Sequence, residues 1–538
     1  MKSILFFCAV VLLSSYCTTN AQSNDPTRDK CKPLTTQVIN DHYDFISINN
    51  ILMWMGNNGD MAFNPITNEA GLEWPKGSGK YLVMKDGFVI GGKIDGKIRI
   101  AGSTYRQGFQ AGKILPDGTP DDPSLSRYRI YKVRKIRSSQ YYQMSAEEQE
   151  RLARDFKEWP AEDGAPYTDR NNNGRYDPDF TAWLDNWDNS DEPFIVGNEV
   201  LWFVMNDMDS LRSMRLYGTP PIGLEVQVLV WGYDNYGPLG NTVFVKYTII
   251  NKGGENLTDA YFAKWSDIDV GNPDDDLVGV DTLLNLGYGY NFNVNDGVYK
   301  ISPAVGYDFL QGPVVPQPGA TAKYNFGDRT GYRNLPMTSF IFYIGGDPIY
   351  MSAPLGDGYV QMYNNLLGKM WNGTYPHDPI TNQPTKFLCA GDPITGRGWV
   401  DGRTTMPSDR TILPSSGPFT LAVGDTQEVV VGTIVARGAD RLNSVQMLRY
   451  YDRFIQVAFN YNFDLPRSPP TPVVRTTILP NKIVLYWGDQ KQVDRIEKYH
   501  NRGYKFQGYN IYQFPNRDAF FEGGKRLATY DVVDNVAT

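Results

Sequence analysis

Apolar and polar residues alternate along much of the chain, and the clearest case is a pair of runs at 87–94 and 97–101. The two runs are separated by Asp95-Gly96, a pair typical of a two-residue type I′ turn between antiparallel strands. In that register Ile100 belongs to a buried face, whereas Arg99 faces water. The opening region of the chain is therefore predicted to be β-structure.

Longer strand-like runs follow in the middle of the chain, joined by turn residues such as Gly, Pro and Asn. They are Val200–Met205, Gly223–Gly232, Asn241–Asn251, Asp259–Ile268 and Val278–Tyr290. Tyr247 and Ile249, and the opposing Tyr261 and Ala263, alternate with polar neighbours, as a sheet with one buried face requires. These runs predict a mainly β protein built on an antiparallel β-sandwich.

A further strand pair is predicted at 417–427 and 428–436. Between this pair and the earlier strands lies a long segment, at about 291–415, that is rich in Gly, Pro, Asn and Tyr. We expect this insertion to consist mostly of ordered loops with short strands such as Ser339–Ile344, because disordered segments are poor in aromatic residues.

Two substantial helices are predicted. The first covers about 145–158, with Ser145 as its N-cap and Leu152 and Phe156 four residues apart on one face. The second covers 439–459, where apolar residues recur at three- and four-residue spacing, and it is expected to pack on the sandwich as a closing element.

A proline-rich stretch at 466–472 indicates a stiff linker, and therefore a domain boundary. Beyond it, Lys482–Gly488 and Gly508–Gln513 resemble the B and C strands of a fibronectin type III module, with Trp487 and Tyr512 as the core aromatics that this resemblance implies. The predicted organisation is a signal peptide at 1–21, an N-terminal β-rich region at 22–165, a central β-sandwich with acidic loops and a closing helix at 166–465, and a linker with a partial fibronectin-like domain at 466–538.

The first residues form a secretory signal peptide: Lys2 precedes an apolar run at 4–13, and small residues stand before Gln22. The mature chain has no other apolar run long enough for a transmembrane helix. The predicted location is therefore extracellular or on the outer cell surface. Two cysteines remain after cleavage, Cys31 and Cys389, which either form a disulfide or stay as separate thiols.

The chain is acidic, with 52 Lys and Arg against 60 Asp and Glu and a formal net charge of −8. This balance disfavours nucleic acid and anionic membranes as partners. One basic run, Arg127–Arg137, could suggest a polyanion site. An edge strand whose charges prevent pairing with another sheet is the preferred interpretation.

The candidate chemistry begins with a calcium-type loop that starts at Asp169. Short oxygen-bearing side chains stand at its positions 1, 3, 5 and 9, Gly174 supplies the turn, and Arg175 offers a backbone carbonyl at position 7. The side chains are those of Asp169, Asn171, Asn173 and Asp177. Position 12 is Phe180 in place of the usual Glu, so a closing carboxylate is expected from Asp179, Asp185 or Asp188.

A second acidic cluster follows the strand predicted at 259–268. Asp267 and Asp269 alternate onto one face of the strand end, beside the three acids of the next turn, of which Asp276 is the last. So many carboxylates repel one another unless a cation lies among them. The alternatives are a second calcium site and a solvated loop.

Signals for an enzyme are weak. The chain has three histidines, and it contains neither a His-Glu-x-x-His motif nor a Gly-x-Ser-x-Gly nucleophile motif. A pair of acids in a glycosidase arrangement is never excluded in an acidic chain, but no pair stands out. The aromatic content of 13% suits either glycan stacking or ordinary β-sandwich packing.

Several motifs together are similar to those of large secreted proteins of Bacteroidota and related bacteria. They include Asp163-Gly-Ala-Pro-Tyr, the loop at 169–178, Pro221-Ile-Gly-Leu-Glu-Val-Gln-Val and Trp265-Ser-Asp-Ile-Asp-Val-Gly. The set also includes Val305-Gly-Tyr-Asp-Phe-Leu-Gln-Gly-Pro, and Gly417-Pro-Phe with Gly424-Asp-Thr-Gln. The resemblance covers roughly 74–472 and implies export by type IX secretion, although this sequence lacks the sorting domain that such proteins often carry. Members of this group have no assigned activity, so the resemblance does not indicate a mechanism.

Together these features predict a non-enzymatic, calcium-stabilised secreted or cell-surface protein with an adhesive or structural role, whose partners are cell-surface proteins or glycans. The alternative is an extracellular protein that binds or cleaves carbohydrate. That alternative requires exposed aromatic residues along a cleft beside a pair of carboxylates.

Overall fold

The computed structural model describes residues 42–464, 469–501, 504–514 and 524–533. The chain divides into two compact units, Met1–Val457 and Ala458–Thr538. Residues on both sides of the predicted boundary at 165/166 therefore lie in one unit. The predicted signal peptide and Cys31 lie outside the described residues, and Cys389 is buried, which raises the pKa of its thiol.

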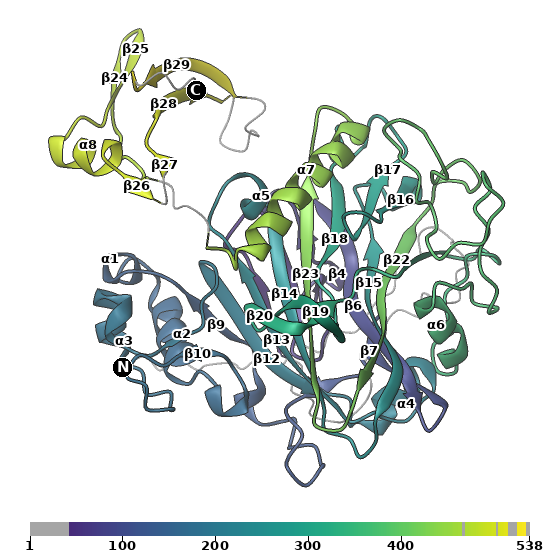
Figure 1. Cartoon of the computed structure of the whole chain (residues 1–538). Coiled ribbons are helices and arrows are strands. Elements are labelled where there is room, and N and C mark those ends of the chain that lie inside the picture. Colours follow the sequence, from purple (N-terminus) through teal and green to yellow (C-terminus); the bar gives the residue numbers. More distant parts are fainter. Residues whose placement is uncertain (1–41, 465–468, 502–503, 515–523, 534–538) are drawn as a thin grey trace, which may run out of the picture. The chain divides into compact units, whose positions relative to one another are not determined.

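The first unit contains two large antiparallel sheets (Figure 1). The first has eight strands in the order β1-β2-β5-β6-β15-β22-β21, with β7 paired to β6. Its strands are β1 (Tyr43–Ile46), β2 (Leu52–Gly56), β5 (Leu72–Glu73), β6 (Tyr81–Ile94), β7 (Lys97–Ser103), β15 (Leu257–Ile268), β21 (Ser339–Ile344) and β22 (Arg410–Leu421).

The second sheet has nine strands in the order β16-β17-β18-β23-β14-β13-β12-β8, with β9 paired to β12. Its strands are β8 (Gln110–Ala111), β9 (Tyr131–Arg134), β12 (Glu199–Asn206), β13 (Leu224–Gly232), β14 (Thr242–Asn251), β16 (Asp276–Asp281), β17 (Leu286–Asn291), β18 (Ala304–Gln311) and β23 (Thr426–Ala436).

Aromatic side chains from the two sheets meet in the core between them. Phe88 of β6 and Phe262 of β15 lie 5.0 Å and 5.3 Å, centroid to centroid, from the ring of Tyr247 on β14. Phe262 also approaches Phe309 of β18 at 6.1 Å. Such pairs contribute about 0.5–1.5 kcal/mol each beyond their buried area. The prediction of a mainly β, antiparallel sandwich is confirmed.

The predicted hairpin at Asp95-Gly96 is present and joins β6 to β7. Asp95 has φ 48° and Gly96 has φ 75°, the positive values that a type I′ turn requires. Ile94 pairs with Lys97 across the turn, and Ile100 is buried.

The assignment of strands to sheets differs from the sequence prediction in two places. The runs around Tyr247 and Tyr261 belong to different sheets, because β14 pairs with β13 and β23 whereas β15 pairs with β6 and β22. β22 and β23, predicted as a pair, also lie in opposite sheets. Alternation shows that a strand has a buried face, but it does not identify the neighbouring strand.

The face of β15 that meets the other sheet is not the one that the alternation suggested. Phe262 contacts Tyr247 of the second sheet in the core. Tyr261 and Ala263 are buried, as predicted, but Tyr261 lies on the opposite face of the strand and contacts Tyr363 of helix α6 (Tyr359–Leu366). Alternation shows that a face is buried, but it does not show what covers that face.

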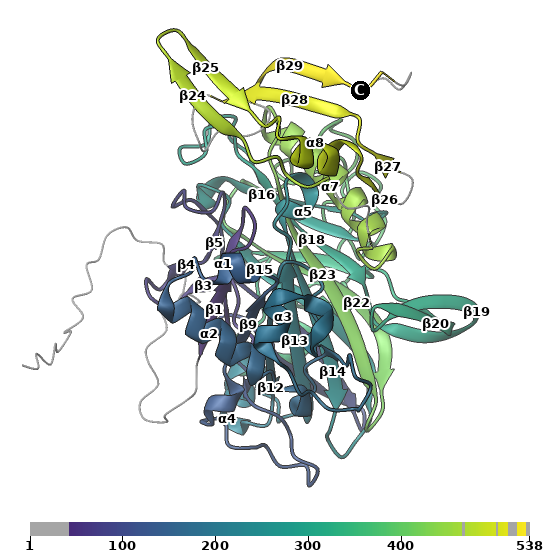
Figure 2. The same cartoon turned by 90° about the vertical axis from the view of Figure 1, so that its left-hand side faces the viewer.

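The segment at 291–415 contains more regular structure than predicted. It supplies β18 to the second sheet, next to β23, and its last residues begin β22 of the first sheet. It also forms the hairpin of β19 (Val314–Tyr324) and β20 (Gly327–Asn334), which projects from the sandwich in Figure 2. The run predicted as one strand at 278–290 is two, β16 and β17.

Both predicted helices are confirmed. α2 (Ala146–Lys157) begins with Ser145, whose hydroxyl accepts a hydrogen bond from Glu148 N in a capping box. α7 (Arg441–Asn460) buries Val445, Leu448 and Ile455. Its Leu448 lies against Gly306 of β18, so α7 covers the outer face of the second sheet.

The remaining elements of the first unit are short. They are β3 (Phe63–Asn64), β4 (Glu69–Ala70), η1 (Ser126–Tyr128), α1 (Ser138–Tyr141), η2 (Ala161–Asp163), β10 (Tyr167–Thr168), α3 (Phe180–Asp185), η3 (Trp187–Asn189), β11 (Glu192–Pro193), α4 (Ser210–Tyr217), α5 (Gly237–Gly240), η4 (Pro273–Asp275) and α6 (Tyr359–Leu366). Among the described residues, no helix has the length and apolar character needed to cross a membrane.

The second unit consists of two-stranded ladders and one helix. Its elements are β24 (Arg475–Leu479), β25 (Lys482–Tyr486), α8 (Gln490–Glu497), β26 (His500–Asn501), β27 (Tyr504–Lys505), β28 (Gly508–Gln513) and β29 (Lys525–Asp531). β24 pairs with β25, and β28 with β29. Trp487 and Tyr512, expected as core aromatics, are half-buried, and Trp487 contacts Tyr509 at 5.5 Å.

Candidate metal centre

Three carboxylates from neighbouring strand ends converge at one end of the first sheet. Asp267 is the last residue but one of β15, Asp269 directly follows the strand, and Asp409 directly precedes β22. One oxygen from each carboxylate lies within 4.8 Å of the other two. Because β15 and β22 are antiparallel, the end of one strand lies beside the start of the other, which brings residues about 140 positions apart together.

A fourth carboxylate, Asp276, reaches the cluster from the second sheet. Asp276 is the first residue of β16 and is fully buried. Its Oδ2 accepts a hydrogen bond from Val270 N at 3.4 Å, and its backbone oxygen accepts one from Ser408 N, next to Asp409, at 3.3 Å. Its Oδ1 is buried and has no hydrogen-bond partner among the described residues. A buried, unpartnered oxygen near the carboxylates of Asp269 and Asp409 is unfavourable without a cation.

The electrostatics of these groups reflect this crowding. Burial raises the pKa of Asp276 well above its usual value, and the charges of Asp269 and Asp409 raise it further. Burial, followed by the charges of Asp409 and Asp269, likewise raises the pKa of Asp267. Hydrogen bonds from Thr411 Oγ1, at 3.0 Å, and from the Tyr105 hydroxyl oppose that increase and hold the Asp267 carboxylate in place.

Arg410, which follows Asp409 in the chain, pairs with a different carboxylate, that of Asp401. Arg410 is fully buried, and its Nε lies 3.1 Å from Asp401 Oδ2. Its Nη2 donates to Asp401 Oδ1 at 3.3 Å and to Met406 O at 2.7 Å. This guanidinium therefore balances Asp401 and is not directed at the cluster.

The structure separates the other acids of the predicted cluster from Asp267 and Asp269. Asp274 is exposed, and Asp275 accepts hydrogen bonds from Asn291 Nδ2 and Asn293 N, both at 2.9 Å. Asp281, at the other end of β16, forms an ion pair with Arg449 of α7 at 3.2 Å. Of the predicted residues, Asp267, Asp269 and Asp276 remain together.

Sequence reasoning missed Asp409. It lies in Pro-Ser-Asp-Arg, a turn-like stretch before a strand that is indistinguishable from an ordinary loop. The only signal that could have found it is the pairing of β15 with β22, and the sequence does not encode that pairing locally.

The Asp169 loop has a different geometry, because its side-chain oxygens already accept backbone hydrogen bonds from the loop. Asp169 Oδ1 and Oδ2 accept from Asn173 N at 3.3 Å and Gly174 N at 2.8 Å. Asn173 Oδ1 accepts from Arg175 N at 2.8 Å. The side chains of Asn171 and Asn173 each donate to Asp177 at 3.0 Å. The loop is exposed except for Asp169 and Tyr176, which are half-buried.

Asp191 supplies the additional carboxylate of this loop. It is buried, and its oxygens accept hydrogen bonds from Arg170 N at 2.8 Å and Asp177 N at 3.2 Å. The side chains of Asp177 and Asp191 are in hydrogen-bond contact, which lowers the pKa of Asp177, as do the amides of Asn171 and Asn173. Two carboxylates thus meet at the loop.

The three acids expected to close the loop have other partners. Asp179 caps α3 by accepting hydrogen bonds from Thr181 N and Ala182 N, both at 3.0 Å. Asp185 accepts from Ser138 Oγ at 2.8 Å. Asp188 forms an ion pair with Arg170 at 3.2 Å. The spacing along the chain suggested these acids, but helix α3 directs the first of them away from the loop.

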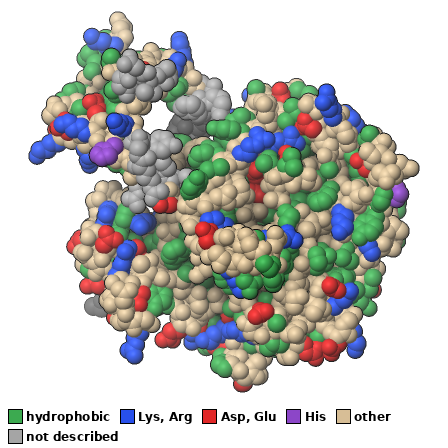
Figure 3. All heavy atoms as spheres, in the orientation of Figure 1, with side chains coloured by type: hydrophobic (Ala, Val, Ile, Leu, Met, Phe, Trp, Pro, Cys, Tyr) green, Lys and Arg blue, Asp and Glu red, His purple; other side chains and the backbone are tan. Residues whose placement is uncertain are grey.

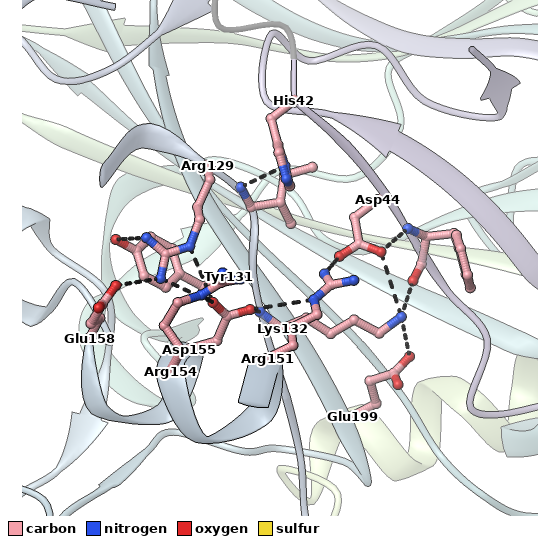
Figure 4. Close-up of polar contacts among 12 residues, drawn as sticks. His42, Asp44, Arg129, Tyr131, Lys132, Arg151, Arg154, Asp155, Glu158 and Glu199 are labelled. Atoms are coloured by element: carbon pink, nitrogen blue, oxygen red, sulfur yellow. Dashed lines mark hydrogen bonds and ion pairs between the residues drawn. The ribbon is translucent and has the colours of Figure 1, made fainter. Parts of the chain in front are cut away.

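The basic run at 127–137 is neutralised by acids from α2 and the neighbouring strands (Figure 4). Arg129 lies 3.0 Å from Asp155 and 2.8 Å from Glu158, and Lys132 lies 3.7 Å from Asp44 and 3.8 Å from Glu199. Within this run β9 pairs only with β12 among the described strands, so it is an edge strand, as expected. On the face shown in Figure 3, basic and acidic side chains are interspersed.

A cleft of about 940 Å³ lies elsewhere in the first unit. Its lining is glycine-rich, and none of its lining residues, all within the described part of the chain, is Tyr, Trp or Phe. The buried carboxylates of Asp163 and Glu225 are paired with Lys113 and Lys252, each at 2.6 Å. The aromatic platform that the carbohydrate alternative requires is not found along this cleft.

Comparisons with known proteins add no family to this description: no family model matches the chain, and no curated protein is similar to it.

Proposed function

We propose that this chain is a secreted or cell-surface calcium-binding protein with a non-enzymatic, adhesive or structural role. The observation that carries the proposal is the convergence of Asp267, Asp269 and Asp409 within 4.8 Å, together with the buried, unpartnered Oδ1 of Asp276. A cation at this point would be ligated from both sheets. It would thereby tie β15 and β22 of one sheet to β16 of the other.

The ligand set favours calcium. All four side chains offer carboxylate oxygens, the donors that hard cations prefer, and calcium accepts six to eight oxygens at about 2.3–2.6 Å in irregular geometry. Asp269 and Asp409 are half-buried, so an ion and its remaining waters have access from solvent. Extracellular calcium is abundant enough for weak sites, with dissociation constants on the order of 10⁻⁴–10⁻³ M.

The Asp169 loop is proposed as a second, weaker site. Its Asp-x-Asn-x-Asn-Gly order and the approach of Asp191 to Asp177 support the assignment. Its oxygens already accept backbone hydrogen bonds, however, so an ion gains less by entering it. The chain's own hydrogen bonds compete with the metal.

The adhesive or structural role rests on the predicted export signal and on the fibronectin-like strands of the second unit. β25 and β28 coincide with the two runs that resemble strands of such a module. Partners would be surface proteins or glycans of the same extracellular environment. We include export by type IX secretion, which the sequence resemblance implies, in this proposal.

Calcium-dependent thermal stability tests the metal assignment. Wild type and Asp409→Asn are melted in chelator and in excess calcium, with Asp274→Asn as a matched control from the exposed turn nearby. We expect calcium to raise the melting temperature of the wild type and of the control, and to leave Asp409→Asn unchanged. A wild type that is indifferent to calcium, with no metal in the purified protein, would refute the proposal.

A further inference from the structure

The sandwich interior contains an ion pair that the proposed metal centre does not use. Lys264 Nζ on β15 lies 2.7 Å from Asp86 Oδ1 on β6, and both side chains have zero exposure. In these neighbouring antiparallel strands Asp86 is paired with Ser266, so Lys264 and Asp86 are diagonal neighbours on the inner face of the sheet. A primary amine and a carboxyl group are held in contact away from water.

Aromatic residues surround this pair. The Lys264 Nζ atom lies 5.6 Å and 5.9 Å from the ring centroids of Tyr307 and Tyr247. It also lies 3.3 Å from the Tyr247 hydroxyl. Phe88 and Phe262 continue the aromatic layer beside Tyr247. The hydroxyl accepts a hydrogen bond from the amine and so holds Nζ in place.

Burial makes the ionised form of this pair unfavourable. It raises the pKa of Asp86 to about 6, although Lys264 opposes the change, and the charge of Asp60 adds to it. Burial by itself lowers the pKa of Lys264. The charges and hydrogen bonds of Asp86 and Tyr247 outweigh this effect, so the pKa of Lys264 is raised overall. Transfer of one proton across the 2.7 Å contact gives a neutral amine and a neutral acid, the two forms that a low-polarity interior accepts.

We propose that Lys264 and Asp86 form an intramolecular amide bond. The lone pair of the neutral Nζ attacks Cγ of the protonated Asp86, which forms the N–C bond. One carboxyl oxygen then leaves as water, with its own hydrogen and one that passes to it from the nitrogen across the 2.7 Å contact. The step needs no oxidant, cofactor or other reactant.

Two other buried ion pairs show what distinguishes this one. Lys246 Nζ lies 2.5 Å from Glu428 Oε1, also between neighbouring strands. Glu428 Oε2, however, accepts hydrogen bonds from Asn325 N at 2.6 Å and Gln311 Nε2 at 3.4 Å, which favour the ionised carboxylate. The fully buried Asp401 faces Arg410, whose guanidinium is always protonated and is no nucleophile.

The bond would join β6 to β15 in the middle of the eight-stranded sheet. Residues 86 and 264 are 178 positions apart (264 − 86), so the link closes a loop that contains strands of both sheets. A covalent link across such a loop restricts the unfolded chain and slows unfolding.

Intact mass spectrometry of the denatured full chain tests this. We expect the wild type to be lighter than its processed sequence by one water molecule, and Lys264→Arg to have the full mass. Lys246→Arg, the matched control, should keep the deficit. Protease digestion of the wild type should yield one branched peptide that contains both Lys264 and Asp86.

Cyclisation at an Asp-Gly turn, such as Asp95-Gly96, also removes one water. That deficit would persist in Lys264→Arg and would give no branched peptide, and this result would overturn the proposal. So would a wild type with the full mass. If Lys264→Arg fails to fold, the branched peptide of the wild type still decides the outcome.

Discussion

The two acidic regions of this protein differ in the feature that marks each of them as a candidate metal site. The Asp169 loop has the order of residues expected of a calcium loop, yet its oxygens accept hydrogen bonds from the loop itself, and most of it is exposed. The Asp267 cluster has no such order, yet it brings three carboxylates together within 4.8 Å. The buried Asp276, whose Oδ1 has no hydrogen-bond partner among the described residues, is close enough for the charges of Asp269 and Asp409 to raise its pKa.

The physical difference is the alternative that each region has without an ion. An exposed carboxylate can be solvated by water or by nearby amides at little cost, whereas buried carboxylates of like charge raise one another's pKa. The cluster therefore gains more from a cation than the loop does. The predictions below test this ranking.

The largest effect is expected at Asp276. Asp276→Ala should abolish the calcium-dependent part of stability, which is about 2.7 kcal/mol at a hundredfold excess over the dissociation constant. For a unit of this size this corresponds to roughly 3 °C. In chelator the variant should be no less stable than the wild type, because a buried charge has been removed. Calorimetry with and without calcium measures both.

A calcium effect that survives in Asp276→Ala would place the ion elsewhere and reverse the ranking of the two regions.

The second effect concerns pH. The pKa values of Asp267 and Asp276 are raised by burial and by their neighbours, so the calcium-free folded state binds more protons than the unfolded chain. The contribution of these two groups to stability is therefore fully present below about pH 4, the unfolded pKa, and is lost as pH rises through the folded values. Stabilisation by calcium should accordingly grow from about pH 5 to pH 8.

Thermal melts in chelator and in calcium at several pH values measure this. A calcium effect that is constant over that range would contradict it.

The third effect sharpens the comparison with a buried pair of acids whose further neighbour, Asp281, is paired with Arg449. Asp308 of β18 and Asp452 of α7 are buried in contact, which raises the pKa of Asp308 well above its usual value and that of Asp452 to about 7. Stability from this pair is present at low pH and is lost as pH rises through about 7. Asp308→Asn should add about 1 kcal/mol at pH 8, because it removes the like-charge repulsion.

This gain should be independent of calcium, and it should vanish at pH 5. Chemical denaturation at the two pH values tests it, and a gain that required calcium would make this pair a metal site instead.

The smallest effect is expected at the loop. Asp169→Ala removes two exposed hydrogen bonds to backbone amides, so it should cost about 1 kcal/mol or less and should change the calcium effect little. Denaturation in calcium and in chelator measures both quantities. Loss of most of the calcium effect in this variant would show that the loop is the main site.

Much of the local structure was predictable from the sequence. The turn at Asp95-Gly96, the capped helix that begins after Ser145 and the apolar face of α7 each depend on residues within one or two turns of one another. Local propensity and periodicity determine such elements.

The features that the sequence did not predict depend on contacts between segments that are far apart in the chain. The face of β15 that carries Phe262 meets the second sheet, and Ala304–Gln311 enters that sheet from a segment that resembles a loop in composition. Asp191 reaches the Asp169 loop through the folding of the intervening α3.

The sequence by itself determined the β character of the chain, and it pointed to three of the four acids of the candidate metal centre, Asp267, Asp269 and Asp276. Only the tertiary structure decided that Asp409 joins them and that Lys264 meets Asp86 in the core. The physical reason is that strand alternation defines which faces are buried, whereas strand pairing, which places side chains from distant residues in contact, is set by the packing of the whole sandwich.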